Sequence, residues 1–234
     1  WVKTEGATTN LYFTNEDSQD VQITNGSSLA GGGGGGASTL NGLSDVLGDD
    51  NNETHFARSL LIETDGTTPT TGTLDYATDN IGIGNGTFTA LTSGYSNVGI
   101  GNYVLDALIS GSNNTCIGHS SGTAITTGAT NTAVGANTLD AQVSGVRNTA
   151  IGYNSLTANA TSATGDNTAL GCSSGLGIYE GINNTIIGSG AGPQNISTVH
   201  NTVIIGKDAG AGTMTSHANG TIAIGHSAGK AITS

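Results

Sequence analysis

The residues best suited to acid–base chemistry are two aspartates, Asp106 and Asp140, which occupy equivalent positions in a repeated pattern. Each lies five residues after a glycine that ends a short repeated phrase. Paired carboxylates hydrolyse glycosidic bonds when they lie about 5 to 9.5 Å apart. Two repeat units separate these aspartates, or roughly 10 Å if the units stack as neighbouring strands. We attribute the match to a shared Leu-Asp-Ala turn and predict no catalytic residues.

Metal chemistry has equally weak candidates. The histidines are His55, His119, His200, His217 and His226. No pair of them has the spacing of a metal site. The acids Asp49, Asp50 and Glu53 could ligate calcium, but they lack the spacing and the glycine of an EF-hand loop. We interpret them as an acidic surface loop and predict neither a metal nor a cofactor.

The two cysteines, Cys116 and Cys172, lie just over three repeat units apart and at different positions of the repeat. A disulfide needs Cα atoms within about 7 Å, which stacked units at roughly 4.8 Å each do not provide. Both are therefore interpreted as small, buried filling residues.

The chain from Asp79 onward repeats one phrase: an asparagine, two small or β-branched residues, an aliphatic residue and a glycine. Seven copies begin with asparagine, from Asn80 to Asn184, and two looser copies begin with Thr202 and Thr221. The closing glycines are 17 to 19 residues apart, at positions 84, 101, 118, 135, 152, 171, 188, 206 and 225. Such regular spacing indicates a repeat architecture. The sequence predicts an all-β fold, a β-solenoid or β-roll of about nine coils of 17–19 residues.

The phrase also predicts how each coil is built. In residues 148–152, alternation places Thr149 and Ile151 on one face of a strand and Asn148 and Ala150 on the other. We expect the aliphatic position to stack from coil to coil and fill a narrow interior. We expect the asparagines to form a ladder, and the closing glycine to supply a corner with positive φ. Extra residues at 161–165 and 215–220 should bulge from one edge.

The first third of the chain is predicted to be organised differently. Residues 1–30 contain two β-prone runs, 10–14 and 20–24, and form an N-terminal β-hairpin or attachment region. Six glycines at 31–36 are typical of a flexible linker. Residues 37–79 form an acidic β connector, in which 40–47 is a helical turn or extended leader and 59–63 a strand. Residues 80–234 form the solenoid.

Composition favours a thin, elongated core. Glycine accounts for 39 of 234 residues, charged residues for 9% and aromatic residues for 4%. The net charge of −12 divides into −10 over residues 1–79 and −2 over residues 80–234. No basic patch is present to neutralise phosphates, an anionic bilayer would repel the chain, and no apolar run is long enough to span a membrane. Neither nucleic acid nor a membrane is an expected partner.

Residues 148–156, Asn-Thr-Ala-Ile-Gly-Tyr-Asn-Ser-Leu, followed by a polar stretch, resemble repeats in virion fibre proteins of marine tailed bacteriophages. They are also similar to the Asn-Ser-Val-Ala-Ile-Gly phrase in the heads of trimeric autotransporter adhesins, which form left-handed parallel β-rolls as trimers. The resemblance covers residues 80–234. A longer period than in the adhesin heads, and Thr where they have Val, favour the phage fibres.

The resemblance implies a structural and adhesive fibre segment of a virion, extracellular and non-enzymatic. Its expected partners are other virion structural proteins and a host surface glycan or protein. A trimeric autotransporter-type adhesin is the main alternative, and a polysaccharide-depolymerising tailspike is a third. Because the chain opens on Trp1 and ends within a tenth repeat, we expect it to be a piece of a longer protein.

A homotrimer is also expected from the size of the coil. A coil of 17 residues with one aliphatic strand encloses little core. We expect its repeated Ala and Gly positions to form a small-residue face that packs around a threefold axis.

Overall fold

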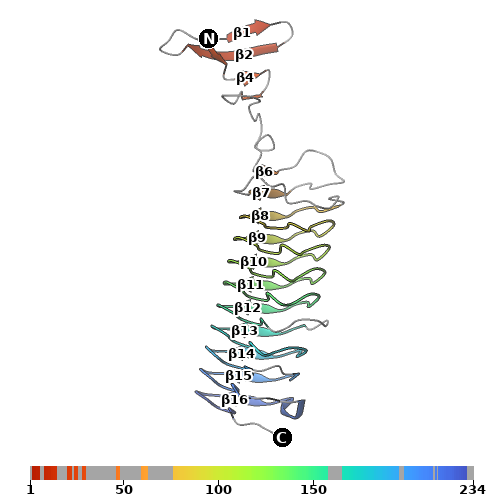
Figure 1. The fold of residues 1–234 in the computed structure, drawn as a ribbon, viewed down its shortest axis with the longest axis vertical. Coiled ribbons are helices and arrows are strands. Elements are labelled where there is room, and N and C mark those ends of the chain that lie inside the picture. Colours follow the sequence, from red (N-terminus) through yellow and green to blue (C-terminus); the bar gives the residue numbers. More distant parts are fainter. Residues whose placement is uncertain are drawn as a thin grey trace.

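The computed structural model of the 234-residue chain is an all-β structure dominated by one parallel β-solenoid (Figure 1). It describes residues 59–62, 76–157, 165–194, 198–212, 214 and 216–230, together with the backbone of six short strands near the N-terminus. The predicted polyglycine linker, the acidic loop at 49–53 and His55 lie outside the described residues.

Eleven strands form the main sheet, and ten of them run parallel in sequence order. The parallel strands are β7 (Leu60–Ile62), β8 (Ile81–Ile83), β9 (Val98–Ile100), β10 (Thr115–Ile117), β11 (Thr132–Val134), β12 (Thr149–Ile151), β13 (Thr168–Leu170), β14 (Thr185–Ile187), β15 (Val203–Ile205) and β16 (Ile222–Ile224). Strand β6 (Val46–Leu47) pairs antiparallel with β7 at one end. Because equivalent residues pair from coil to coil, such as Ala133 with Ala150, each repeat position forms a column. The predicted β-solenoid is confirmed.

The remaining strands form two small antiparallel sheets. One sheet contains β1 (Val2–Glu5), β2 (Thr8–Thr14) and β3 (Asp20–Gln22), and the other contains β4 (Thr24–Asn25) and β5 (Ser28–Leu29). The predicted runs at 10–14 and 20–24 fall on β2, β3 and β4, so the N-terminal β structure extends beyond one hairpin. Of the two expected bulges, residues 158–164 lie outside the described part, and Ser216–Ala218 forms a short 3₁₀ turn.

Each coil turns at four positions where φ is positive. The closing glycine has φ between 124° and 137°, and the second and fourth residues after it have φ between 50° and 83°. The last of the four positions with positive φ is the residue just before the ladder asparagine, such as Thr130 with φ 60°. A β-branched residue in the left-handed region costs about 1–2 kcal/mol, so the stacked hydrogen bonds must hold these corners in place. The predicted glycine corner is confirmed.

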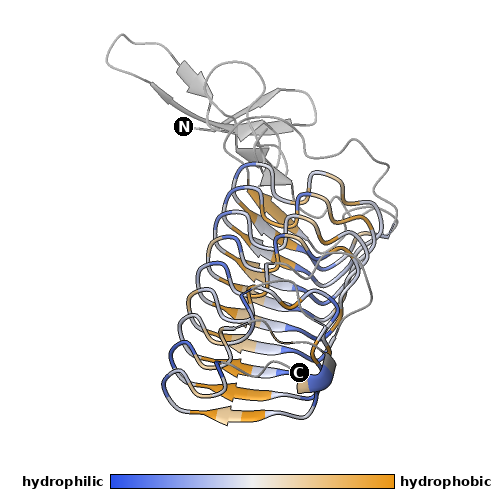
Figure 2. Cartoon of the chain, turned by 60° about the horizontal axis from the view of Figure 1, so that its bottom comes forward, coloured by the Kyte–Doolittle hydropathy of each residue, from blue (hydrophilic) through white to orange (hydrophobic). Residues whose placement is uncertain are grey.

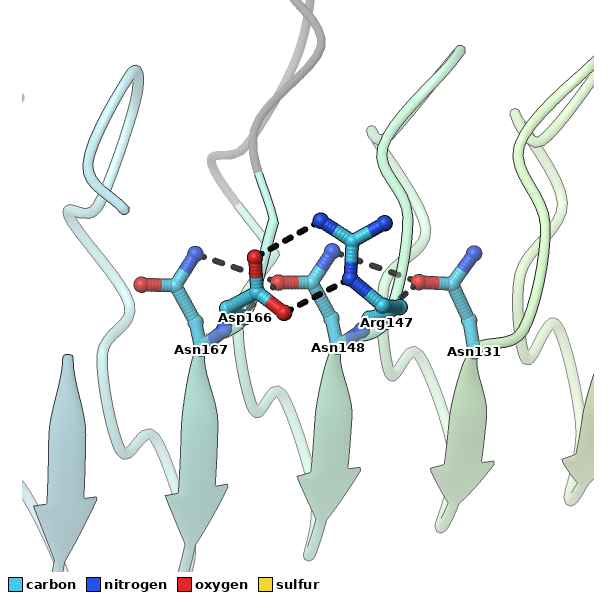
Figure 3. A network of polar contacts seen from close by, with 5 residues as sticks. All are labelled: Asn131, Arg147, Asn148, Asp166 and Asn167. Atoms are coloured by element: carbon cyan, nitrogen blue, oxygen red, sulfur yellow. Dashed lines mark hydrogen bonds and ion pairs between the residues drawn. The ribbon is translucent and has the colours of Figure 1, made fainter. Parts of the chain in front are cut away.

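The asparagine ladder inside the solenoid is also confirmed, and Figure 3 shows amides bonded from coil to coil. The Asn131 Nδ2 donates to Asn114 Oδ1 at 3.0 Å and to the Gly145 carbonyl at 2.8 Å. Its Oδ1 accepts the backbone N–H of Asn148 at 3.0 Å and the Asn148 Nδ2 at 3.2 Å. A buried amide with four partners avoids the desolvation cost of an unpaired polar group. The ladder ends at Thr202, whose Oγ1 donates to Asn184 Oδ1 at 2.7 Å.

The expected core arrangement is wrong, because the aliphatic position of the strand faces outward. The central residue of every strand from β7 to β16 is buried, and in most of them it is Gly, Ala or Cys. Most of the large core side chains come from the segment after the closing glycine, including Phe88, Leu91, Leu105 and Leu108. The ladder asparagine occupies the inner face, and alternation then places the strand's first and third residues outside.

Candidate interaction surface

The outer face of the parallel sheet is a regular, exposed surface of the described solenoid, and we call it the outer sheet face. It consists of the first and third residues of β7 to β16, which form two columns. The first column is Leu60, Ile81, Val98, Thr115, Thr132, Thr149, Thr168, Thr185, Val203 and Ile222. The second column is Ile62, Ile83, Ile100, Ile117, Val134, Ile151, Leu170, Ile187, Ile205 and Ile224.

Every residue of the outer sheet face is exposed or half-buried, and none carries a charge. Exposure of the side chains is substantial, at 36% for Ile117, 44% for Leu170 and 64% for Ile224. Figure 2 shows hydrophobic colour along these strands, most continuously in the last coils. A contiguous apolar surface of this kind is typical of an interaction site.

The two columns differ in chemistry along the solenoid. The second column is aliphatic in every strand, whereas the first changes from Ile81 and Val98 to five successive threonines and back to Val203 and Ile222. The threonines, from Thr115 to Thr185, add a hydroxyl beside each aliphatic side chain. The face therefore has a mixed central section between two fully aliphatic ends.

Asp106 and Asp140 do not form an acid–base pair in the structure. They follow strands β9 and β11, and the coil of β10 lies between them, where Thr123 occupies the equivalent position. Burial raises the pKa of both carboxyls above their ordinary value of 3.8. The Asp106 Oδ1 is buried and has no hydrogen-bond partner among the described residues. Two half-buried carboxyls on separate coils provide no shared site for a substrate.

The histidines take part in local contacts. The His119 ring lies edge-on to Tyr103 with 6.0 Å between the ring centroids. The His200 Nδ1 accepts the Ile182 backbone N–H at 3.1 Å. In the described part of the chain, no group of three His, Cys, Asp or Glu side chains could hold a metal ion.

The cysteines differ from each other, and the prediction that both are buried is wrong for one of them. Cys116 is the inward central residue of β10, and burial raises the pKa of its thiol to about 12. Cys172 follows the closing Gly171 and is exposed. Both thiols are free.

An ion pair connects two coils at the edge of the sheet (Figure 3). The Arg147 Nε and Nη2 donate to the Asp166 carboxylate at 2.7 and 2.8 Å. This pair lowers the pKa of Asp166 and raises that of Arg147. Both residues precede a ladder asparagine, so the pair spans the two ends of the 19-residue unit. Sequence reasoning missed it because the partners are neighbours only after the coils stack.

Comparisons with protein-family models, with curated proteins and with solved structures found no match. Among the described residues, none belongs to a helix of the length and apolarity that a bilayer span requires.

The outer sheet face was also missed by sequence reasoning, which assigned its aliphatic residues to the core. A signal was present in the central strand position, which changes from Gly82 and Gly99 in early repeats to Ile186 in a later one. Variation between Gly and Ile at one position indicates a site whose volume is adjusted by neighbours, as expected of an interior.

Proposed function

We propose that this chain is a structural and adhesive fibre segment of a bacteriophage virion, assembled as a homotrimer and projecting toward the host surface. The observation that carries the proposal is the single in-register stack of ten parallel strands. At about 4.8 Å per strand spacing, such a stack forms a rod on the order of 40 Å long. A rod of this kind gives reach to whatever is attached at its end.

Two features of the solenoid suit a rigid rod. The ladder asparagines bind neighbouring coils through amide hydrogen bonds, and a Cβ on a closing glycine such as Gly135 would lie 2.6 Å from the Gly152 carbonyl oxygen of the next coil. Bending would therefore disturb many contacts together. In addition, the solenoid contains few titratable side chains, with a net charge of −2 over residues 80–234. Its shape should therefore change little with pH or salt.

The adhesive part of the proposal rests on repetition. Several symmetric copies that each make weak contacts raise avidity when they bind together. The acidic first third of the chain, with a net charge of −10 over residues 1–79, would serve as the attachment portion toward other virion proteins. A host surface glycan or protein is the proposed target of the assembled fibre.

The proposal is tested on particles of the virus that encodes the chain. Antibodies against residues 80–230 are applied to purified virions and visualised with gold particles in the electron microscope, with pre-immune serum as the control. We expect label along a tail or capsid appendage. Virions without label, and label on the bacterial envelope in uninfected cells, would contradict the phage proposal and favour the trimeric autotransporter-type adhesin.

A further inference from the structure

We propose that the outer sheet face is the surface through which copies of this chain pack against one another. The inference rests on the homo-oligomer in the proposed function, and it assigns the contact to a different surface from the one the sequence predicted. The Ala and Gly residues of the central strand positions cannot form that contact, because they are buried inside the coil, as Ala133 and Ala150 are. The aliphatic columns are exposed or half-buried and remain available for this contact.

Charge favours a second copy as the occupant. A chain with a net charge of −12 should repel its own copies, yet the outer sheet face carries no charge. Two pairs of charged residues near its edges neutralise each other internally. Arg147 pairs with Asp166, and the Lys207 Nζ lies 2.6 Å from the Asp208 carboxylate. Identical faces can therefore approach without bringing like charges together.

The shape of the face also suits contact between sheets. The strands are parallel and in register over ten coils, so the two columns form continuous rows of side chains. Rows of this kind on neighbouring copies can interdigitate, as the side chains of packed sheets do. Threonine and isoleucine are β-branched and have few rotamers to lose on burial.

The area of the face corresponds to a weak specific association. Ten strands about 4.8 Å apart and about 10 Å long cover roughly 430 Å². A standard interface buries about 800 Å² per partner, and weaker specific interfaces bury less than about 600 Å² per partner.

Charged substitutions on and off the face test the assignment. Ile117→Lys and Leu170→Lys place a charge on the outer sheet face, and Ile109→Lys is the matched control. Ile109 is 43% exposed, similar to Leu170 at 44%, but it lies outside the strands. Light scattering on the full chain should give an oligomer for the wild type and for Ile109→Lys, and the mass of a single chain for both face variants. Far-ultraviolet circular dichroism checks that each variant is folded.

A cross-linking experiment covers the case in which the lysine variants do not fold. In a Cys172→Ser background, Thr149→Cys places a thiol on the face and Ile109→Cys places one off it. A bis-maleimide should join Thr149→Cys chains covalently and leave Ile109→Cys chains separate.

The outcomes separate the interface from the oligomer. A wild-type oligomer that keeps its mass in both lysine variants, with no cross-link through Thr149→Cys, overturns the interface and leaves the homo-oligomer intact. A wild-type chain that is a monomer at all accessible concentrations overturns both. The virion assignment is decided separately by the labelling experiment.

Discussion

The two faces of each short strand contrast more sharply than any two other regions of the molecule. In β12, Ala150 is fully buried, while its neighbours Thr149 and Ile151 remain partly exposed. The smaller residue is inside and the larger is outside, the reverse of the usual relation between size and burial. The inner face is instead completed by Asn148, a polar residue with no exposure.

The difference teaches that the polar ladder, and not hydrophobicity, determines which side of the strand is inside. An asparagine with four hydrogen bonds is stable in the interior. Once it faces inward, the residue two positions later must do so as well. The narrow coil leaves room at that position only for a small side chain, unless the residue facing it across the coil is itself small, as Gly192 is opposite Ile186. The larger aliphatic residues are then left for contacts outside the coil.

The largest effect should come from removing one ladder amide. Asn131→Ala would leave the Gly145 carbonyl and the Asn148 backbone N–H without their partners in the interior. We expect a loss of about 4 kcal/mol in the free energy of unfolding, measured by urea denaturation. Asn102→Ala, at an exposed position, is the matched control and should change stability by less than about 0.5 kcal/mol. Equal effects for the two variants would show that the inner face does not depend on the ladder.

The closing glycines should be the next most sensitive positions. Gly135 has φ 133°, and a Cβ there would lie 2.6 Å from the Gly152 carbonyl oxygen. We expect Gly135→Ala to lower the free energy of unfolding by about 3 kcal/mol. Gly220 has φ 75°, and a Cβ added there would meet no atom within 4 Å, so Gly220→Ala should cost only about 1 kcal/mol. Comparing the urea midpoints of the two variants separates the loss of stability caused by the steric clash from the loss caused by backbone strain. If Gly135→Ala were as stable as Gly220→Ala, the closing glycines would not stack closely.

Exchanging size between the faces should have an intermediate effect. Ala150→Ile overfills the coil and is expected to cost about 2 kcal/mol, whereas Ile151→Ala on the outer face should cost a single chain less than about 0.5 kcal/mol. Adding Leu156→Gly to Ala150→Ile should restore part of the loss. Two coils later the equivalent positions hold Ile186 and Gly192, and a Cβ added at Gly192 would lie 3.1 Å from the Ile186 side chain. A large residue at the first position is therefore accommodated by glycine at the second. A double-mutant cycle on thermal unfolding measures the compensation. Additive losses would mean that the two positions do not share one space.

The smallest effect should be a gain in stability at Asp106. Its Oδ1 is buried without a partner, and the neighbouring coils carry Thr89 and Thr123 at the equivalent position. Asp106→Thr should raise the free energy of unfolding by about 1 kcal/mol at neutral pH, a low value because the residue is only half-buried. Since burial raises the pKa of Asp106 in the folded chain, ionisation opposes folding above that pKa. The gain should therefore vanish as the pH falls below 3.8. A gain that persists in acid would exclude this cause.

The architecture could be predicted from the sequence because it is periodic. Spacing alone indicated stacked coils, and the identities of asparagine and glycine indicated their roles, since few other residues form amide ladders or tolerate a φ near 130°. The strand at 59–63 was recognised because its apolar run precedes a turn, and it became β7.

The side of the strand could not be predicted from alternation alone, because alternation defines two faces without naming the inner one. The interior depends on residues from a second segment, such as Leu139 and Leu156, whose burial follows only from left-handed corners at non-glycine residues. Sequence patterns give little warning of such corners. The aliphatic residues of the outer sheet face were consequently assigned to the core, and the buried small residues at the central strand positions were assigned to a surface.

The most direct test uses the two native cysteines. Cys116 stands at the inward central position of a strand, with its thiol pKa raised to about 12, whereas Cys172 is exposed. The folded wild-type chain is treated with a thiol reagent at neutral pH, and the labelled peptides are identified by mass spectrometry, with urea-unfolded chain as the reference. We predict one reactive thiol per folded chain, Cys172, and two after unfolding. Rapid labelling of Cys116 in the folded chain would contradict the inward orientation of the small residues.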